Sequence, residues 1–253
     1  MSDPVAQLLP VAAVFLLAGL VKGVIGLGLP TVAMGLLGLL MKPAEAAALL
    51  ILPSLATNLW QLFQGPRFGE LLRRLRGMMA AIFIGTVAAS GIVAGGDSAL
   101  IRAGLGAALI VYALFGITKV SLQVPQASER WAGPVVGATT GLMTGATGVF
   151  VIPAVPYLAG LGLQRDVLVQ ALGLSFTVST VALGLGLGWN GALPASAMGA
   201  SLGAIAPALL GMAAGAWLRH RVSPAAFRRW FFIGLGVLGG EILWRAVSNG
   251  GLL

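Results

Sequence analysis

The chain has 253 residues, of which 58% are hydrophobic and only 9% are charged, and its mean hydropathy is +0.99. A soluble domain has about 25% charged residues, so this composition excludes an ordinary soluble enzyme, a disordered chain and a nucleic-acid-binding protein. The net charge of +8 is instead typical of basic loops that face anionic lipid. Because cysteine is absent and there is one histidine, we expect no metal site, no cofactor and no catalytic residue.

Charged residues are absent from four long stretches of the chain, 46–66, 77–96, 131–164 and 167–218. A helix needs about 20 apolar residues to cross a hydrocarbon layer of about 30 Å. The sequence therefore predicts an all-α, polytopic transmembrane helical bundle that forms a single integral membrane domain over residues 1–253. Ten apolar segments are expected, at 4–22, 25–41, 44–63, 77–95, 99–118, 131–147, 149–162, 166–188, 195–218 and 224–247.

Two of these segments, 25–41 and 149–162, are short, follow a glycine-rich break and contain proline. Each forms a pair with the segment before it. The pairs 4–22/25–41 and 131–147/149–162 are either two full crossings or re-entrant hairpins, and the sequence leaves both readings open.

An eight-residue pattern recurs in the chain, first at 19–26 and again at 141–148. Three glycines and one leucine match at the same spacing, and Pro30 then corresponds to Pro153 with one residue inserted. We therefore expect two repeats, over 4–119 and 131–248. Each repeat has five apolar segments, and this odd number inverts the second copy relative to the first.

The basic residues provide a test of that inversion, because loops rich in Lys and Arg face the cytoplasm. Arginines cluster after the third segment of the first half and after the fourth segment of the second half. If the loops 64–76 and 219–229 are cytoplasmic, 12 of the 15 basic residues lie on one side and both termini lie outside. Inverted repeats are typical of secondary transporters, whose substrate site lies near the middle of the membrane.

The two glycine-rich breaks are the first candidates for such a site. Glycine, proline and hydroxyl residues would open the helix there, and freed main-chain N–H groups bind anions. The alternative is that the glycines only permit close helix packing. Lys22 lies in the first break, either near the middle of the membrane facing an anion or extended to the inner surface. The corresponding residue in the second break is Thr144.

Hydroxyl and amide side chains within two apolar segments are the second group of candidates. They would bind an anion, or they would only join neighbouring helices through hydrogen bonds. The complete set of predicted substrate-binding residues is Lys22, Gly23, Gly26, Gly28, Thr31, Thr57, Asn58, Gln61, Thr144, Gly145, Thr147, Gly148, Gln170, Ser175, Thr177 and Ser179.

The duplicated motif, Gly19–Pro30 and Gly141–Pro153, resembles that of the TauE/SafE family of sulfite exporter-like permeases, also called the toluene sulfonate uptake permease family. The resemblance covers essentially the whole chain. It implies transport of a sulfur-containing anion, such as sulfite, sulfoacetate or another organosulfonate, across the cell inner membrane. The candidate partners are this small anion, the lipid bilayer, a coupling proton or sodium ion, and a second copy in a homodimer. An anion channel and a transporter of a non-sulfur organic anion are the alternatives.

Overall fold

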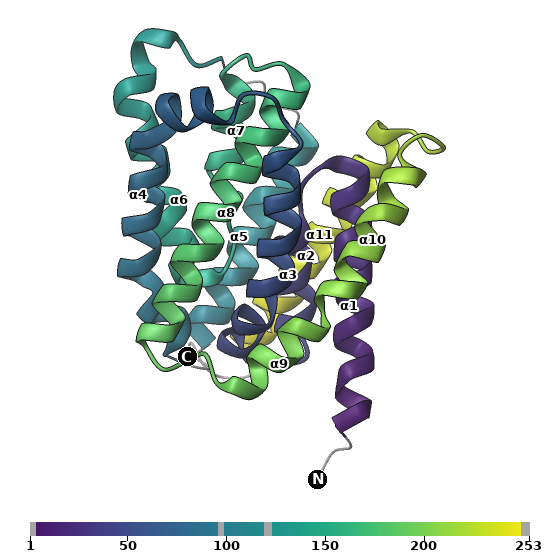
Figure 1. Cartoon of the computed structure of the whole chain (residues 1–253). Coiled ribbons are helices and arrows are strands. Elements are labelled where there is room, and N and C mark those ends of the chain that lie inside the picture. Colours follow the sequence, from purple (N-terminus) through teal and green to yellow (C-terminus); the bar gives the residue numbers. More distant parts are fainter. Residues whose placement is uncertain (1–3, 96–98, 119–122, 249–253) are drawn as a thin grey trace.

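The computed structural model describes residues 4–95, 99–118 and 123–248, which are helical throughout apart from their connections (Figure 1). No strand occurs among these residues. The helices are α1 (Pro4–Ile25), α2 (Leu29–Gly38), α3 (Pro43–Phe63), α4 (Phe68–Ala94), α5 (Ala99–Thr118), η1 (Gln126–Ser128), α6 (Glu129–Thr147), α7 (Ala154–Gly160), α8 (Arg165–Trp189), α9 (Ala195–Gly203), α10 (Ile205–Leu218) and α11 (Pro224–Ser248).

Among the described residues, six helical stretches are long and apolar enough to cross a membrane. They are α3, α4, α5, α8, α11 and the combined stretch Ala195–Leu218, which contains α9 and α10. These spans confirm the predicted all-α, multi-pass membrane bundle.

The two short segments form broken helix pairs. At a rise of about 1.5 Å per residue, the ten residues of α2 span about 15 Å and the seven residues of α7 about 10 Å. Neither length crosses a hydrocarbon layer of about 30 Å. Residues 26–28, between α1 and α2, are hereafter elbow 1, and residues 148–153, between α6 and α7, are elbow 2.

Close helix pairs join the two halves of the chain. Helix α1 packs on α10 and α6 packs on α4, with glycine at each contact. A Cβ atom added at Gly23 would overlap the carbonyl oxygen of Met212, and one added at Gly145 would overlap that of Thr86. The glycines therefore allow the close approach of backbones that stabilises helix pairs in lipid.

Two further pairs join helices that hold the same place in each half. Helix α3 lies against α8, and α5 lies against α11. Gly173 of α8 faces Leu62 of α3, while Thr180 bonds Asn58, so the residue numbers rise along one helix as they fall along the other. The same holds for α5 and α11, where Gly106 faces Gly239 and Gly116 faces Phe232. An inverted repeat requires this antiparallel arrangement.

The structure differs from the sequence prediction in two places. The predicted arginine-rich loop 64–76 is helical from Phe68 onward, because its Arg, Leu and Glu residues favour helix. The predicted segment 195–218 is interrupted at Ala204. Pro207 explains the interruption, since a proline has no N–H and its ring clashes with the carbonyl four residues earlier, here that of Gly203.

Some sequence predictions concern residues outside the described part of the chain. These are the outward position of both termini (1–3 and 249–253) and the end of the first repeat at residue 119.

Candidate functional site

Lys22 is the charged residue at the centre of the candidate site. It lies in the last turn of α1 and is only 2% exposed, so its side chain does not extend to a membrane surface. The ammonium Nζ donates hydrogen bonds to Thr57 Oγ1, at 3.2 Å, and to Asn58 Oδ1, both on α3. An ammonium group has three N–H donors, so these two bonds leave one donor for a ligand.

Asn58 extends this contact to the second half of the chain. Its Nδ2 donates to Thr180 Oγ1 on α8 at 3.2 Å, and the Thr180 hydroxyl donates to the carbonyl of Phe176 at 2.7 Å. Thr180 lies 15 residues after the start of α8 and nine before its end, or about 22 Å and about 14 Å along the helix. The chain of bonds from Lys22 to Thr180 therefore lies well inside the bundle.

Elbow 1 begins four residues after Lys22, at Gly26. Gly26 and Gly28 have φ angles of +82° and +104°, a left-handed backbone that suits glycine and strains other residues. The main-chain N–H groups of Leu27 and Gly28 form no hydrogen bond with any described residue. Gln61 of α3 fixes the elbow, because its Nε2 donates to the carbonyl of Gly26 at 2.8 Å, whereas its buried Oε1 has no partner among the described residues.

Elbow 2 has a similar backbone but different polar groups. Gly148 has φ of +71°, and the N–H groups of Phe150, Val151 and Ile152 form no hydrogen bond within the described chain. Thr144, the counterpart of Lys22, donates its hydroxyl to the carbonyl of Thr140 at 2.7 Å. Residues 149–152 are at most 5% exposed.

The Thr147 hydroxyl forms hydrogen bonds at the start of elbow 2. Its hydroxyl donates to the carbonyl of Met143 at 2.7 Å and accepts a bond from the N–H of Val149 at 3.3 Å. Gly145 packs on α4 and lines none of the cavities described below. The predicted residues of the second break are therefore enclosed by protein.

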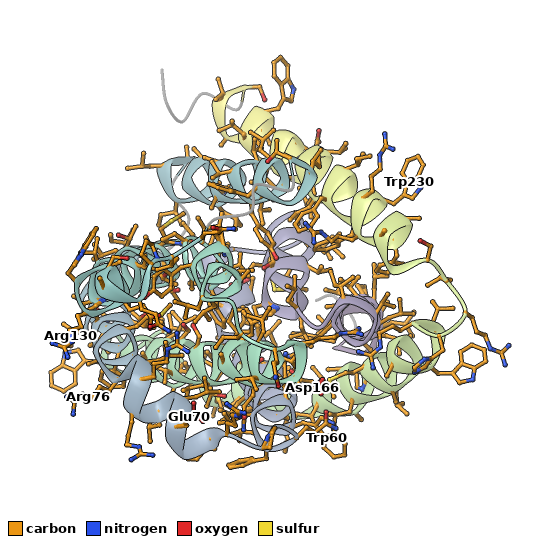
Figure 2. The ribbon with its side chains drawn as sticks, turned by 90° about the horizontal axis from the view of Figure 1, so that it is seen from above. Trp60, Glu70, Arg76, Arg130, Asp166 and Trp230 are labelled. Carbon is orange, nitrogen blue, oxygen red and sulfur yellow. The ribbon has the colours of Figure 1, made fainter. Side chains whose placement is uncertain are left out.

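Three cavities surround elbow 1. The first, of about 510 Å³, is lined by Lys22, Gly23, Gly26, Gln61 and side chains of α10. The second, of about 290 Å³, reaches Gly26 from the opposite side, between α5, α7, α8 and α11. The third, of about 380 Å³, continues from Gln61 toward the helix ends. Figure 2 shows Trp60, which lines the first cavity, and Asp166, which lines the third, along one edge of the bundle.

Arginine side chains border these cavities. Arg165 lines the second and third, Arg219 lines the first and third, and Arg228 lines the second. These three arginines outnumber the one carboxylate of the linings, Asp166, and an excess of positive charge raises the local concentration of anions. The approach to elbow 1 therefore favours anions.

Several further hydroxyl groups are buried inside the bundle. Three of the predicted residues, Thr31, Ser175 and Ser179, have a buried hydroxyl oxygen that has no partner among the described residues. The buried hydroxyl oxygens without a partner among the described residues are those of Thr31, Ser54, Thr86, Tyr112, Ser175 and Ser179. Thr177 differs, because its hydroxyl donates to the carbonyl of Gly173 in its own helix at 2.7 Å.

The Gln170 side chain forms hydrogen bonds with the backbone at the end of α3 and in the turn that follows it. Its Nε2 donates to the carbonyls of Leu62 and Gly65 at 2.9 and 2.7 Å, and its Oε1 accepts from the N–H of Arg67 at 2.9 Å. These bonds secure the turn between α3 and α4. The structure therefore separates Gln170 from the group formed by Lys22, Thr57, Asn58 and Gln61.

Sequence reasoning did not include Thr180, Gln64, Arg165 or Arg219 among the site residues. Thr180 completes the bonded chain from Lys22, and the other three line the cavities. A sequence signal existed for Gln64, since it follows Gln61 by one helical turn. The arginines gave no such signal, because the positive-inside tendency alone accounts for basic residues at helix ends.

A multi-pass bundle with broken helices and a buried cation beside a cavity is typical of membrane transport proteins. The chain belongs to the sulfite exporter TauE/SafE family, whose family model matches residues 11–242, nearly the whole chain. This is a family of membrane transporters of the sulfite and anion exporter type. No curated protein and no solved structure matches the chain.

Proposed function

We propose that this protein is a secondary transporter of a small sulfur-containing anion, which is sulfite, sulfoacetate or another organosulfonate. It moves the anion across the cell inner membrane by alternating access, with the binding site between the two repeats. The chain then carries out transport and no catalysis.

The observation that carries this proposal is the environment of Lys22. The ammonium is buried, its two hydrogen-bond partners are neutral, and none of the salt bridges among the described residues includes it. A buried charge without a counter-charge is costly. A bound anion would neutralise it, and the free N–H groups of Leu27 and Gly28 would contribute further donors.

The first cavity supports an anion with an organic part. Beside Lys22 and Gln61 it is lined on the α10 side by Leu209, Met212, Ala213 and Ala216. A sulfonate head on Lys22 would therefore leave its carbon substituent against apolar side chains. The volume of the first cavity, about 510 Å³, is within the range of about 300–1,000 Å³ typical of small-molecule sites.

Gln61 and the two antiparallel helix pairs support the transport mechanism. The unpartnered Oε1 of Gln61 is an acceptor, which suits a coupling sodium ion or a protonated group rather than the anion itself. The pairing of α3 with α8 and of α5 with α11 supports two inverted repeats over 4–119 and 131–248. Rocking of one repeat against the other would expose the site to each side in turn.

Proteoliposomes containing the purified protein test the proposal. Uptake of isotope-labelled sulfite or sulfoacetate should saturate with concentration and depend on a proton or sodium gradient, and Lys22→Ala should abolish it. Lys42→Ala, at an exposed residue, is the matched control and should transport normally. An ohmic anion current without coupling would identify a channel instead, and saturable transport of lactate but of no sulfur anion would identify a carrier of non-sulfur organic anions.

A further inference from the structure

A fourth cavity lies apart from elbow 1, at the arginine-rich ends of α4 and α6. It has a volume of about 580 Å³. Its polar lining consists of Arg73, Arg74, Arg76, Glu129, Arg130 and Tyr157. Arg76 and Arg130, which both line it, lie at one edge of the bundle in Figure 2.

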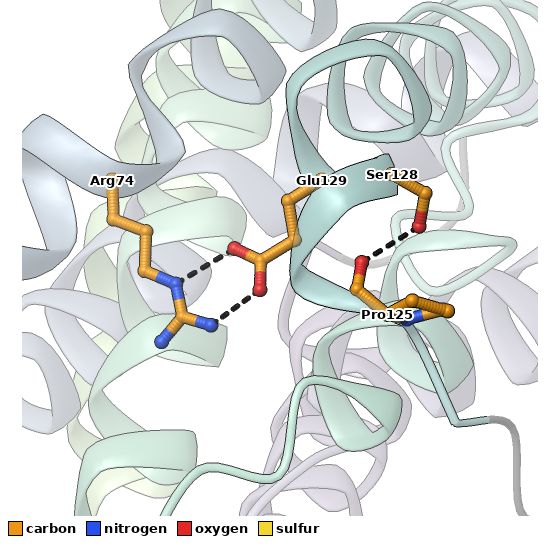
Figure 3. Close-up of polar contacts among 4 residues, drawn as sticks. All are labelled: Arg74, Pro125, Ser128 and Glu129. Atoms are coloured by element: carbon orange, nitrogen blue, oxygen red, sulfur yellow. Dashed lines mark hydrogen bonds and ion pairs between the residues drawn. The ribbon is translucent and has the colours of Figure 1, made fainter.

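The charges of this cavity are not balanced. Glu129 accepts two bonds from Arg74, from Nε at 2.8 Å and from a terminal nitrogen at 2.6 Å (Figure 3). Arg73, Arg76 and Arg130 form no ion pair with the described residues. Three guanidinium groups therefore remain, and guanidinium binds phosphate oxygens through paired hydrogen bonds.

The surface beside the cavity is apolar and exposed. Trp131, Val135 and Leu142 of α6 are between 52% and 66% exposed and follow one another at helical spacing, so they form one apolar face of the helix. Tryptophan is enriched where the membrane meets water. A basic cavity above an apolar helix face matches a molecule with an anionic head and hydrocarbon chains.

The glycine contacts of α4 with α6 do not include these arginines, and the α1–α10 pair has no arginine at the corresponding positions. Helices α1 and α10 pack through the same kind of glycine contacts as α6 and α4. The contacts Gly19–Ala208 and Gly141–Ile82 align the two pairs, and they place Gly199, Ala200 and Leu202 at the positions of the three α4 arginines. These three residues belong to α9, which lies beyond the break at Ala204 and packs on α3, so no charged side chain is present at the corresponding place.

We propose that the cavity between α4, α6 and α7 binds the phosphate head of an anionic phospholipid, with the acyl chains along the exposed face of α6. Arg73, Arg76 and Arg130 hold the phosphate, while the Arg74–Glu129 pair fixes the rim of the cavity. The site is independent of the anion site at elbow 1.

Native mass spectrometry of the detergent-solubilised full chain, titrated with phosphatidylglycerol, tests this site. Wild type should bind one phosphatidylglycerol more tightly than phosphatidylcholine. Arg130→Gln should weaken that binding about fivefold, and Arg73→Gln/Arg76→Gln/Arg130→Gln about 100-fold, since each basic residue near anionic lipid contributes a factor of about five. The matched control, Arg221→Gln/Arg229→Gln, removes two arginines at the same end of the bundle that do not line the cavity, and it should bind as wild type does.

Two results would overturn the proposal. Equal losses of phosphatidylglycerol binding in the cavity variants and in the control would show that the lipid responds only to the overall basic charge of the protein. Binding of inorganic phosphate that competes fully with phosphatidylglycerol would identify a site for free anions instead of lipid. If the triple variant does not fold, the single Arg130→Gln variant decides, and unchanged phosphatidylglycerol binding by it would contradict the assignment.

Discussion

The two elbows of this protein have related sequences and similar backbones but different surroundings. Both begin after a helix that packs through glycine, both contain a left-handed glycine, and both leave main-chain N–H groups without partners among the described residues. A buried ammonium precedes elbow 1, which borders cavities, whereas threonine hydroxyls bonded to the main chain of α6 and of Val149 precede elbow 2, which is enclosed. The comparison teaches that two similar elbow backbones can carry different polar groups, a charged one beside elbow 1 and neutral ones beside elbow 2.

The largest difference is expected between Lys22 and its counterpart Thr144. Lys22→Ala should lower the affinity for the transported anion by at least about tenfold, since a hydrogen bond to a charged group contributes about 1.5–3 kcal/mol. Thr144→Val should change it by less than about threefold, because that hydroxyl bonds its own helix. The measurement is the rise in melting temperature with anion concentration. A larger loss in Thr144→Val than in Lys22→Ala would reverse the roles of the two elbows.

The helices that precede the two elbows should be destabilised to a similar degree when a glycine at their packing contacts is replaced by alanine. Gly23→Ala and Gly145→Ala should each lower the free energy of unfolding by about 1–3 kcal/mol, because the added methyl group meets the backbone of α10 or α4. Gly199→Ala is the control, since nothing lies within 4 Å of its added Cβ, and it should not destabilise the protein. Denaturant unfolding in detergent measures all three. If Gly145→Ala is tolerated while Gly23→Ala is not, the two helix pairs do not pack alike.

Substitution of Gln170 should lower the stability of the protein, whereas substitution of Gln61 should lower its affinity for the anion. Gln170→Leu should cost about 1–3 kcal/mol of unfolding free energy, because it leaves backbone groups of the turn between α3 and α4 without their bonds. It should leave anion affinity unchanged. Gln61→Leu should weaken anion binding, because it releases the carbonyl of Gly26 and thereby elbow 1. The same unfolding and melting experiments provide both values, and loss of anion binding in Gln170→Leu alone would contradict this division.

The smallest effect is expected at the border of the cavities. Arg219→Gln should reduce anion affinity about threefold at low salt and less at high salt, since interactions of exposed charges are screened. Arg221→Gln is the control, because Arg221 stacks on Trp217 and lines none of these cavities. Melting shifts at two ionic strengths measure the difference. A loss at Arg219 that does not depend on salt would indicate direct contact with the anion.

Much of the fold followed from the sequence, because spans depend on the spacing of charges and elbows depend on glycine and proline. The break at Ala204 was not predicted, although Pro207 marks it, because the hydropathy of 195–218 is continuous. Some of the predicted site residues lie together in the structure and others do not. Lys22, Thr57, Asn58 and Gln61 come together, but Gln170 does not join them, because which backbone groups a buried amide meets depends on how helices pack.

The central claim is that the Lys22 ammonium holds the transported anion. The chain contains three lysines, Lys22, Lys42 and Lys119, so nitrogen-15 labelling of lysine side chains gives at most three Nζ signals in a magnetic resonance spectrum. Titration with sulfite or sulfoacetate should shift one signal, which is absent from Lys22→Arg, and leave the other two in place. A Lys22 signal that does not move at anion concentrations that saturate transport would contradict the account.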